Sequence, residues 1–231
     1  MLYVVITTKG GFMDYKFLSE TNLFRGLSED DIKNVLPCLR PVERSYKKNE
    51  IVLNRGDVTD KIGMVLKGGV NIFVASYWGQ GQIFGHVKPG EIFAENYAAI
   101  PGKELLCDVI ANHDSEILFF DFSALVKTCQ KSCPYHNELI LNLIRIAARK
   151  NLLFSNRMIH TSSKSLRGRI SSYLSEQATI NNSNLFSIPF NRQELADYLN
   201  VDRSALSNEL SKMQSEGLLE FYKNSFKLNK K

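Results

Sequence analysis

The feature that most constrains the fold is a change in the spacing of hydrophobic residues near Asp121. Before it, from Glu50 to Phe120, short apolar runs alternate with turn-forming pairs such as Gly56-Asp57, Gly68-Gly69 and Pro89-Gly90. Runs of this kind are typical of short antiparallel strands joined by tight turns. No long helical pattern separates them, which argues against a parallel βαβ sheet. We therefore predict an α+β protein whose N-terminal part is an antiparallel β-roll, or jelly roll.

After Asp121 the hydrophobic residues follow helical spacing, and one amphipathic pattern continues from about Tyr135 to about Ile159. A helix of this length is a rod of roughly 37 Å, at 1.5 Å per residue. Leu139, Leu143 and Leu153 belong to a row near a 3-4 repeat, and a second apolar row lies beside it. One face could therefore pack on the roll and another on a second helix. The alternative is a core helix within a monomer.

A second, smaller unit follows the segment Thr161–Ser165, which we interpret as a hinge and a helix cap. Within this unit, Asn191 can cap one helix and Asp202 a second, with Asn200-Val201 as the turn between them. This outline is that of a helix-turn-helix. Two short apolar segments separated by Lys223-Asn224 then predict a β-hairpin wing. Paired helices of this kind bind DNA in many proteins, but they also occur in structural and protein-binding modules.

The composition indicates the compartment of the protein and limits its possible partners. The four irregularly spaced cysteines are too few for a disulfide-stapled scaffold, and residues 1–12 lack the pattern of a secretory signal, so we expect a reducing cytoplasm. Residues 1–12 fit a strand-like extension, with Met13 as an alternative start. The apolar stretch from Leu139 to Ile159 contains four basic residues, so we expect no membrane span. The net charge of +5 is modest, but ten Lys and Arg against seven Asp and Glu from Lys164 to Lys231 leave the smaller unit basic.

The order of these parts, together with several local motifs, resembles the Crp/Fnr family of bacterial transcription regulators. The resemblance runs from about Leu23 to Leu228, and the motifs that carry it are Leu23–Ser28, Arg55–Asp57, Leu66–Val70, Pro89–Phe93 with Glu95, Gly168–Ile170, and Arg192–Ala196 continuing through Met213. It implies an N-terminal extension and β-roll effector domain over residues 1–134, a dimerisation helix and hinge over 135–163, and a winged helix-turn-helix over 164–231. It further implies a cytoplasmic homodimer that binds a palindromic DNA site, or inverted repeat, and contacts RNA polymerase.

The resemblance also suggests which side chains contact DNA. Base-reading residues in the family lie in the first turns of the second helix, which corresponds here to Arg203, Ser204, Ser207 and Asn208. Many members have glutamate at the position of Ser204 and arginine at that of Asn208, so their familiar half-site is not expected here. Phosphate contacts are expected from the start of the first helix and from nearby basic side chains, namely Arg192, Gln193, Arg167, Arg169 and Lys212. For each of these residues the alternative is simple exposure to solvent.

The signal that would control DNA affinity is less evident from the sequence. Cyclic-nucleotide-binding relatives hold the ribose with a glutamate, matched here by Glu95, and the phosphate with an Arg-Ser pair, which is replaced here by Leu105-Leu106. A nucleotide phosphate buried against two leucines would leave its charge unpaired, so we do not expect cyclic AMP (cAMP). A pocket for an apolar or neutral ligand could still form in the roll, and these side chains serve equally well as core. The positions concerned are Gly90, Glu91, Ile92, Phe93, Glu95, Leu105, Leu106 and Cys107.

A second signal candidate lies at the entrance to the long helix, where Cys129, Cys133 and His136 fall close together. Thiolates and an imidazole can bind zinc, haem iron or an iron–sulfur cluster. The chain lacks the N-terminal cysteine cluster of the oxygen-sensing members, and three local ligands leave at least one to be supplied elsewhere. The alternative is two ordinary cysteines and a helix-capping segment. The effector could thus be a small molecule, a redox change or a gas.

Two other classes of function are less consistent with the sequence. The C-terminal unit of a sensory cyclic-nucleotide-type module could bind protein rather than DNA, although the polar, basic character of Arg203, Ser207 and Asn208 argues against this. An enzyme is not expected, because the sequence shows no P-loop, no nucleophile elbow and no carboxylate pair with a partner at recognisable spacing.

Overall fold

The computed structural model of the chain describes residues 13–75, 81–127 and 134–229. Contacts divide the chain into two compact units, residues 1–148 and 149–231. The boundary falls inside a single long helix, α5 (Pro134–Thr161), in place of the predicted Tyr135–Ile159. The described part of the chain contains no helix with enough length and apolar character to cross a membrane.

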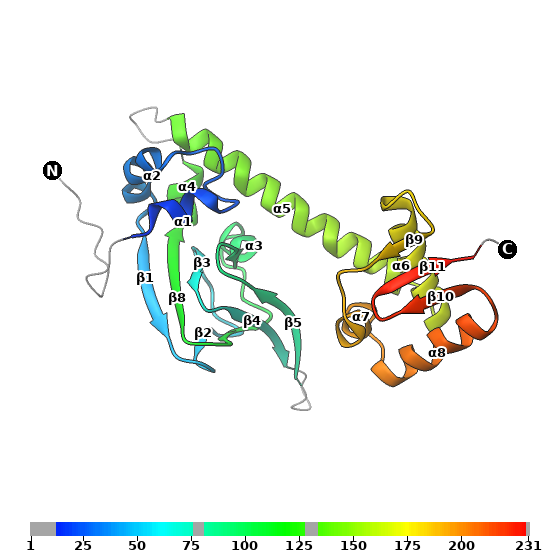
Figure 1. Cartoon of the computed structure of the whole chain (residues 1–231). Coiled ribbons are helices and arrows are strands. Elements are labelled where there is room, and N and C mark those ends of the chain that lie inside the picture. The colour runs from blue at the N-terminus through cyan, green and yellow to red at the C-terminus, as the bar shows by residue number, and fades with distance from the viewer. Residues whose placement is uncertain (1–12, 76–80, 128–133, 230–231) are drawn as a thin grey trace. The chain divides into compact units, whose positions relative to one another are not determined.

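The first unit is an antiparallel roll with helices at one side (Figure 1). One four-stranded sheet has the order β1-β8-β3-β6, and the other has the order β2-β7-β4-β5. The strands are β1 (Val42–Tyr46), β2 (Ile51–Leu53), β3 (Lys61–Lys67), β4 (Val70–Ala75), β5 (Gly81–Val87), β6 (Ile92–Phe93), β7 (Asp108–Ala111) and β8 (Ser115–Asp121). The helices are α1 (Tyr15–Glu20), α2 (Glu29–Val35), the 3-10 helix η1 (Leu36–Leu39), α3 (Glu95–Ala98), α4 (Phe122–Val126) and the first part of α5.

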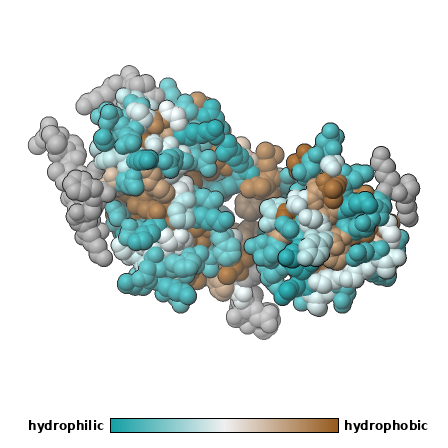
Figure 2. Space-filling model, in the orientation of Figure 1, coloured by the Kyte–Doolittle hydropathy of each residue, from teal (hydrophilic) through white to brown (hydrophobic). Residues whose placement is uncertain are grey.

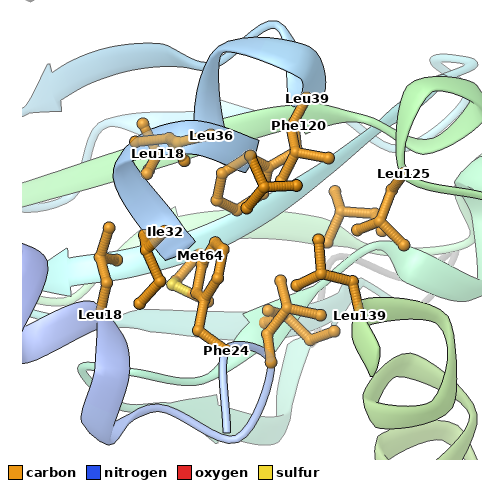
Figure 3. Close-up of a cluster of buried hydrophobic side chains, with 14 of the residues drawn as sticks. Leu18, Phe24, Ile32, Leu36, Leu39, Met64, Leu118, Phe120, Leu125 and Leu139 are labelled. Atoms are coloured by element: carbon orange, nitrogen blue, oxygen red, sulfur yellow. The ribbon is translucent and has the colours of Figure 1, made fainter. Parts of the chain in front are cut away.

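Two hydrophobic clusters hold the roll together. The larger one joins α1, α2 and the start of α5 to the outer face of the β3 and β8 strands, and Figure 3 shows Phe24, Met64 and Phe120 among its side chains. The smaller one fills the space between the sheets and includes Phe93. Gly63 is required there, because a Cβ at this position would meet the Phe93 ring at 2.2 Å.

The start of α5 is fixed to the roll by a buried polar side chain. Asn142 is 1% exposed, and its Nδ2 donates hydrogen bonds to the carbonyl oxygens of Leu23 (3.1 Å) and Arg25 (2.7 Å). These carbonyls belong to the segment before α2, whose own start is closed by a capping box between Ser28 and Asp31. The N-terminal helices and the first turns of α5 therefore form one packed layer on the roll.

The second unit contains the last turns of α5 and a winged helix-turn-helix. Its elements are α6 (Leu166–Ile180), β9 (Leu185–Ser187), α7 (Arg192–Leu199), α8 (Arg203–Ser215), β10 (Leu219–Tyr222) and β11 (Ser225–Leu228). The three strands form an antiparallel sheet in the order β10-β11-β9. Its core is separate from that of the roll and includes Ile170, Leu195, Leu210 and Phe226. The predicted fold class, an antiparallel roll followed by a long helix and a winged helix-turn-helix, is confirmed.

The turn between α7 and α8 forms where the sequence predicts it. Asn200 ends α7 in the left-handed conformation, with φ of 53°, which asparagine adopts more readily than most residues. Ala196 is fully buried on α7, and its carbonyl accepts a hydrogen bond from the Val201 amide at 3.0 Å. Ser165 caps α6 by accepting from the Gly168 amide, as expected for the end of the serine-rich segment.

Candidate DNA-binding surface and effector site

Helix α8 presents a polar face opposite its buried stripe. Leu206, Leu210 and Met213 turn into the core of the second unit. The Asp202 carboxylate caps the helix, since its Oδ1 accepts hydrogen bonds from the amides of Ser204 (2.8 Å) and Ala205 (3.0 Å). Hydrogen bonds from Ser204 and Ala205 hold the pKa of Asp202 below its ordinary value. The first turns of α8 are thus fixed in place with their outer face uncovered.

The four predicted base-reading residues differ in what they can offer. Arg203 and Asn208 are exposed, and neither side chain has a hydrogen-bond partner among the described residues. The Ser204 hydroxyl donates to Asp202, and that of Ser207 donates to the Arg203 carbonyl at 3.0 Å, so both keep only acceptor capacity. Among these four residues, Arg203 and Asn208 therefore supply the available donors.

Arg192 lies beside this face, at the start of α7. Its guanidinium is stacked over the rings of Phe221 (5.0 Å) and Phe226 (5.9 Å) of the wing, and its Nη2 donates to the Lys223 carbonyl at 3.3 Å. Burial lowers the pKa of Arg192, and the positive charge of Arg203 lowers it further. Two like charges held close together favour an anion between or beside them, which a DNA phosphate would provide.

Gln193 is tied to its own helix. Its Nε2 donates to Asp197 Oδ1 at 2.9 Å, and its backbone amide donates to the Asn191 cap. A phosphate contact by the Gln193 side chain would therefore have to replace the hydrogen bond to Asp197.

Two of the other predicted phosphate contacts, Arg167 and Arg169, are engaged inside the unit. Arg167 donates to Glu209 at 2.6 Å and forms a bidentate pair with Glu216 at 2.7 and 2.9 Å. Arg169 donates to the carbonyl oxygens of Leu199 (3.2 Å) and Asn200 (3.1 Å) at the helix-turn-helix turn. Both arginines hold elements of the fold together, a role that sequence reasoning missed. Their phosphate contacts remain predictions, as does that of Lys212, which is exposed.

Most of the predicted effector positions in the roll are packed as core. Ile92, Phe93 and Leu105 are each 2% exposed, and Cys107 is 8% exposed. Burial raises the pKa of the Cys107 thiol. By contrast, Leu106 is 60% exposed. Most of these side chains are therefore buried, and a ligand pocket formed by them remains a prediction.

The polar positions of the same segment shape the backbone. Gly90 has φ of +84°, and Glu91 accepts a hydrogen bond from the Lys88 amide at 2.9 Å, which closes the turn before β6. Glu95, the counterpart of the ribose-binding glutamate, is 4% exposed at the start of α3.

A pocket that the sequence did not predict lies where α1 approaches the β1, β8 and β3 strands. It has a volume of about 320 Å³ and is lined by Met13, Asp14, Phe17, Glu43, Leu66, Lys67 and Glu116. Burial and the nearby charge of Glu116 raise the pKa of Glu43. No local signal could have revealed this pocket, because its walls come from segments far apart in the chain.

Of the predicted metal-ligating residues, only His136 belongs to the described part of the chain; Cys129 and Cys133 lie outside it. His136 is 1% exposed, and its Nδ1 has no hydrogen-bond partner in the described ranges. Within those ranges no group of three or more His, Cys, Asp or Glu side chains could hold a metal ion.

A β-roll followed by a long helix and a winged helix-turn-helix with an uncovered polar face is the architecture of a DNA-binding transcription regulator. Comparison with known families agrees, since the cyclic nucleotide-binding domain matches residues 43–132 and the Crp-like helix-turn-helix domain matches residues 168–230. The chain belongs to the Crp/Fnr family, and it is a transcription regulator with a helix-turn-helix DNA-binding domain.

Individual relatives are distant. The transcriptional activator FnrA of Stutzerimonas stutzeri is 24% identical over 191 residues, covering 77% of this chain and 72% of FnrA. FnrL of Cereibacter sphaeroides is 25% identical over 189 residues, covering 76% of this chain and 71% of FnrL. The structure of the c-di-GMP-responsive regulator CLP of Xanthomonas campestris is similar in fold, with a TM-score of 0.54 and 20% identity over 88% of this chain and all of that one.

Proposed function

We propose that the chain acts in the cytoplasm as a homodimer that binds an inverted repeat in double-stranded DNA and regulates transcription through RNA polymerase. The observation that carries this proposal is the polar face of α8, where Arg203 and Asn208 are exposed with unused donors beside the stacked Arg192. In this assignment Arg203, Ser204, Ser207 and Asn208 contact base edges, and Arg203 binds a guanine through two hydrogen bonds. Arg192 contacts phosphate and fixes the position of the helix without reading sequence.

The dimer is proposed from the surface of α5. Large apolar side chains along this helix are between 46% and 69% exposed, namely Leu141, Ile144, Leu152, Leu153, Phe154, Met158 and Ile159. Hydrophobic residues reach the surface where the second half of the helix lies (Figure 2). A second copy of α5 would cover several of them in a parallel helix pair.

A symmetric dimer dictates a symmetric DNA site. Two recognition helices related by a two-fold axis enter successive major grooves about 34–36 Å apart, so the two half-sites should form an inverted repeat with that spacing. The full chain, mixed with a pool of random duplexes, should enrich such a repeat. Failure to enrich any sequence would overturn the proposal.

The dimer has its own test. Leu152→Glu places a charge on the exposed apolar row of α5 and should shift the sedimentation of the full chain from dimer to monomer. Ile180→Glu makes the same chemical change at an equally exposed residue of α6 and should leave the dimer intact. A monomeric wild type, or equal effects of the two substitutions, would refute the helix pair.

For the signal, we propose a metal or cluster near the start of α5. The buried Nδ1 of His136 without a hydrogen-bond partner in the described ranges supports this, because such a nitrogen is usually satisfied by a partner or a metal. Cys129 and Cys133 are the neighbouring thiol ligands in the sequence. Zinc, haem iron or an iron–sulfur cluster would each accept this donor set, and an iron centre would make the site sensitive to redox state or gas. The burial of Leu105 supports the expectation that cAMP is not the effector.

Metal content and the ultraviolet-visible spectrum of protein purified without oxygen test the signal proposal. Stoichiometric iron, haem or zinc should be present in the wild type and absent after Cys129→Ser with Cys133→Ser, and DNA affinity should change with it. A metal-free wild type whose DNA binding is unaffected by the substitutions would refute it and direct the search to a small molecule in the roll.

A further inference from the structure

The last turns of α5 are fastened to α7, the first helix of the helix-turn-helix. Arg157 donates from Nε to the Tyr198 carbonyl at 2.9 Å and from Nη2 to the Asp197 carbonyl at 2.8 Å. Its guanidinium also lies over the Tyr198 ring at 5.8 Å. Carbonyls at the end of a helix have no partner within the helix and favour a positive charge. Arg157 therefore caps α7 from a different helix.

His160, one turn further along α5, makes a second connection. It is 2% exposed, with Nδ1 at 2.8 Å from the Tyr198 hydroxyl and Nε2 at 2.9 Å from Glu176 Oε2 on α6. The same carboxylate accepts from Asn156 Nδ2 at 3.0 Å. Because an ionised carboxylate only accepts, the His160 Nε2 carries a proton, and in the neutral imidazole Nδ1 accepts from the Tyr198 hydroxyl. Both ring nitrogens are thus used between three helices.

We propose that Arg157 and His160 are positioning residues that make the end of α5 and the helix-turn-helix one rigid piece. We call the contacts of these two residues with α6 and α7 the α5–α7 clamp. Neither residue needs to touch DNA. The division of the chain at Ala148/Arg149, ahead of both residues, agrees with this assignment. The segment Thr161–Ser165, interpreted from sequence as a hinge, is bridged by the clamp and held further by Arg169, which donates to the Ser163 carbonyl at 2.9 Å.

The clamp would determine how strongly the affinity for DNA depends on the distance between the two half-sites. This consequence rests on the proposed dimer on an inverted repeat. When both recognition helices are rigidly attached to a dimer helix, the first binding event places the second helix at its half-site, which raises its effective concentration. A loose attachment spreads the second helix over many orientations, so the gain from the second half-site falls and other spacings are tolerated.

The test uses the full chain and the duplex enriched from the random pool. Arg157→Met with Tyr198→Phe removes the hydrogen bonds of the clamp between α5 and α7 while keeping side-chain bulk. The affinity advantage of the full repeat over a duplex with one scrambled half-site should fall about tenfold, out of the 10²–10⁴ that linkage can supply. Affinity for the single half-site should stay within about twofold, and a repeat lengthened by one base pair should be bound nearly as well as the original.

Milder variants distinguish loss of the clamp from misfolding of the protein. His160→Gln can keep the hydrogen bond to Glu176 but not the one to the Tyr198 hydroxyl, and it should give an intermediate loss. Arg145→Met removes another arginine of α5, whose partners Glu138 and Asn142 belong to the first unit. This variant should keep the preference for the original half-site spacing. Equal losses on full and half-sites, or unchanged spacing preference in the double variant, would overturn the clamp. Absence of any enriched duplex would instead refute the proposed function.

Discussion

The candidate effector segment of the roll and the candidate DNA-binding face of the helix-turn-helix differ in how exposed their side chains are. In the roll, most of the positions that match the ligand-binding segment of nucleotide-binding relatives are buried, with Leu105 and Phe93 each 2% exposed. In the helix-turn-helix, the corresponding positions are open, and Arg203 and Asn208 present unused donors to solvent. The candidate DNA-binding face is thus polar and exposed, whereas the candidate effector segment is largely apolar and buried. The fold is therefore a better guide to the DNA partner than to the signal.

The largest effect is expected from restoring the phosphate-binding arginine. Leu105→Arg would bury a guanidinium without a partner in the roll and should lower the free energy of unfolding by about 3–5 kcal/mol. Leu106→Ser, at the exposed neighbour, should change it by less than about 0.5 kcal/mol. Denaturant unfolding followed by tryptophan fluorescence and circular dichroism measures both. A stable Leu105→Arg variant that binds cAMP would show that the roll keeps a latent nucleotide site.

The next effect concerns base reading. Arg203→Ala should weaken binding to the enriched duplex by about 1–3 kcal/mol while leaving a scrambled duplex almost unchanged. Fluorescence anisotropy with both duplexes measures the two affinities. Equal loss on both would remove Arg203 from the base-reading set.

Arg192→Ala is the matched case for a phosphate contact. It should weaken both duplexes alike, and the slope of log affinity against log salt should become shallower by about 1. Since Arg192 also stacks on Phe221 and Phe226, Arg192→Lys keeps the charge and should recover most of the salt slope. A loss confined to the enriched duplex would instead make Arg192 a base-reading residue.

Some of these features could be predicted from the sequence, and others could not. The caps Asn191 and Asp202 and the turn at Asn200 were predictable, because each acts on backbone groups two to five residues away. The pairing of Arg167 with Glu209 and Glu216 was not, because its partners are 42 and 49 residues distant. The pocket beside α1 escaped prediction for the same reason. Sequence patterns predict hydrogen bonds between residues that are a few positions apart. They do not predict contacts between distant residues, which depend on how the elements pack.

A smaller effect is expected at the cap of the recognition helix. Asp202→Ala leaves amides of α8 without their acceptor and should lower the melting temperature, whereas Asp202→Asn keeps an acceptor and should lower it less. The pKa of Asp202 is depressed in the folded protein, so its contribution is present above about pH 4 and is lost as the pH falls through the folded value. The difference between wild type and Asp202→Ala should therefore shrink in acid; a constant difference would contradict the capping role.

The smallest expected effect is a gain in stability. Tyr173 is buried, and its hydroxyl has no hydrogen-bond partner among the described residues, so Tyr173→Phe should stabilise the second unit by up to about 1 kcal/mol. Tyr198→Phe removes a hydroxyl that is bonded to His160 and should destabilise it by a similar amount. Thermal unfolding of the two variants in parallel gives the sign of each change. Destabilisation by Tyr173→Phe would mean that its hydroxyl is satisfied.

Sequence reading by α8 is tested most directly by competition. A labelled, enriched duplex is displaced either by the same duplex unlabelled or by a scrambled duplex of equal composition. If α8 reads sequence, the enriched duplex should compete at concentrations at least about 10³-fold lower at physiological salt, as expected for specific over non-specific binding. Equal competition by the two duplexes would mean that the exposed face of α8 reads no sequence and that the protein is not a sequence-specific regulator.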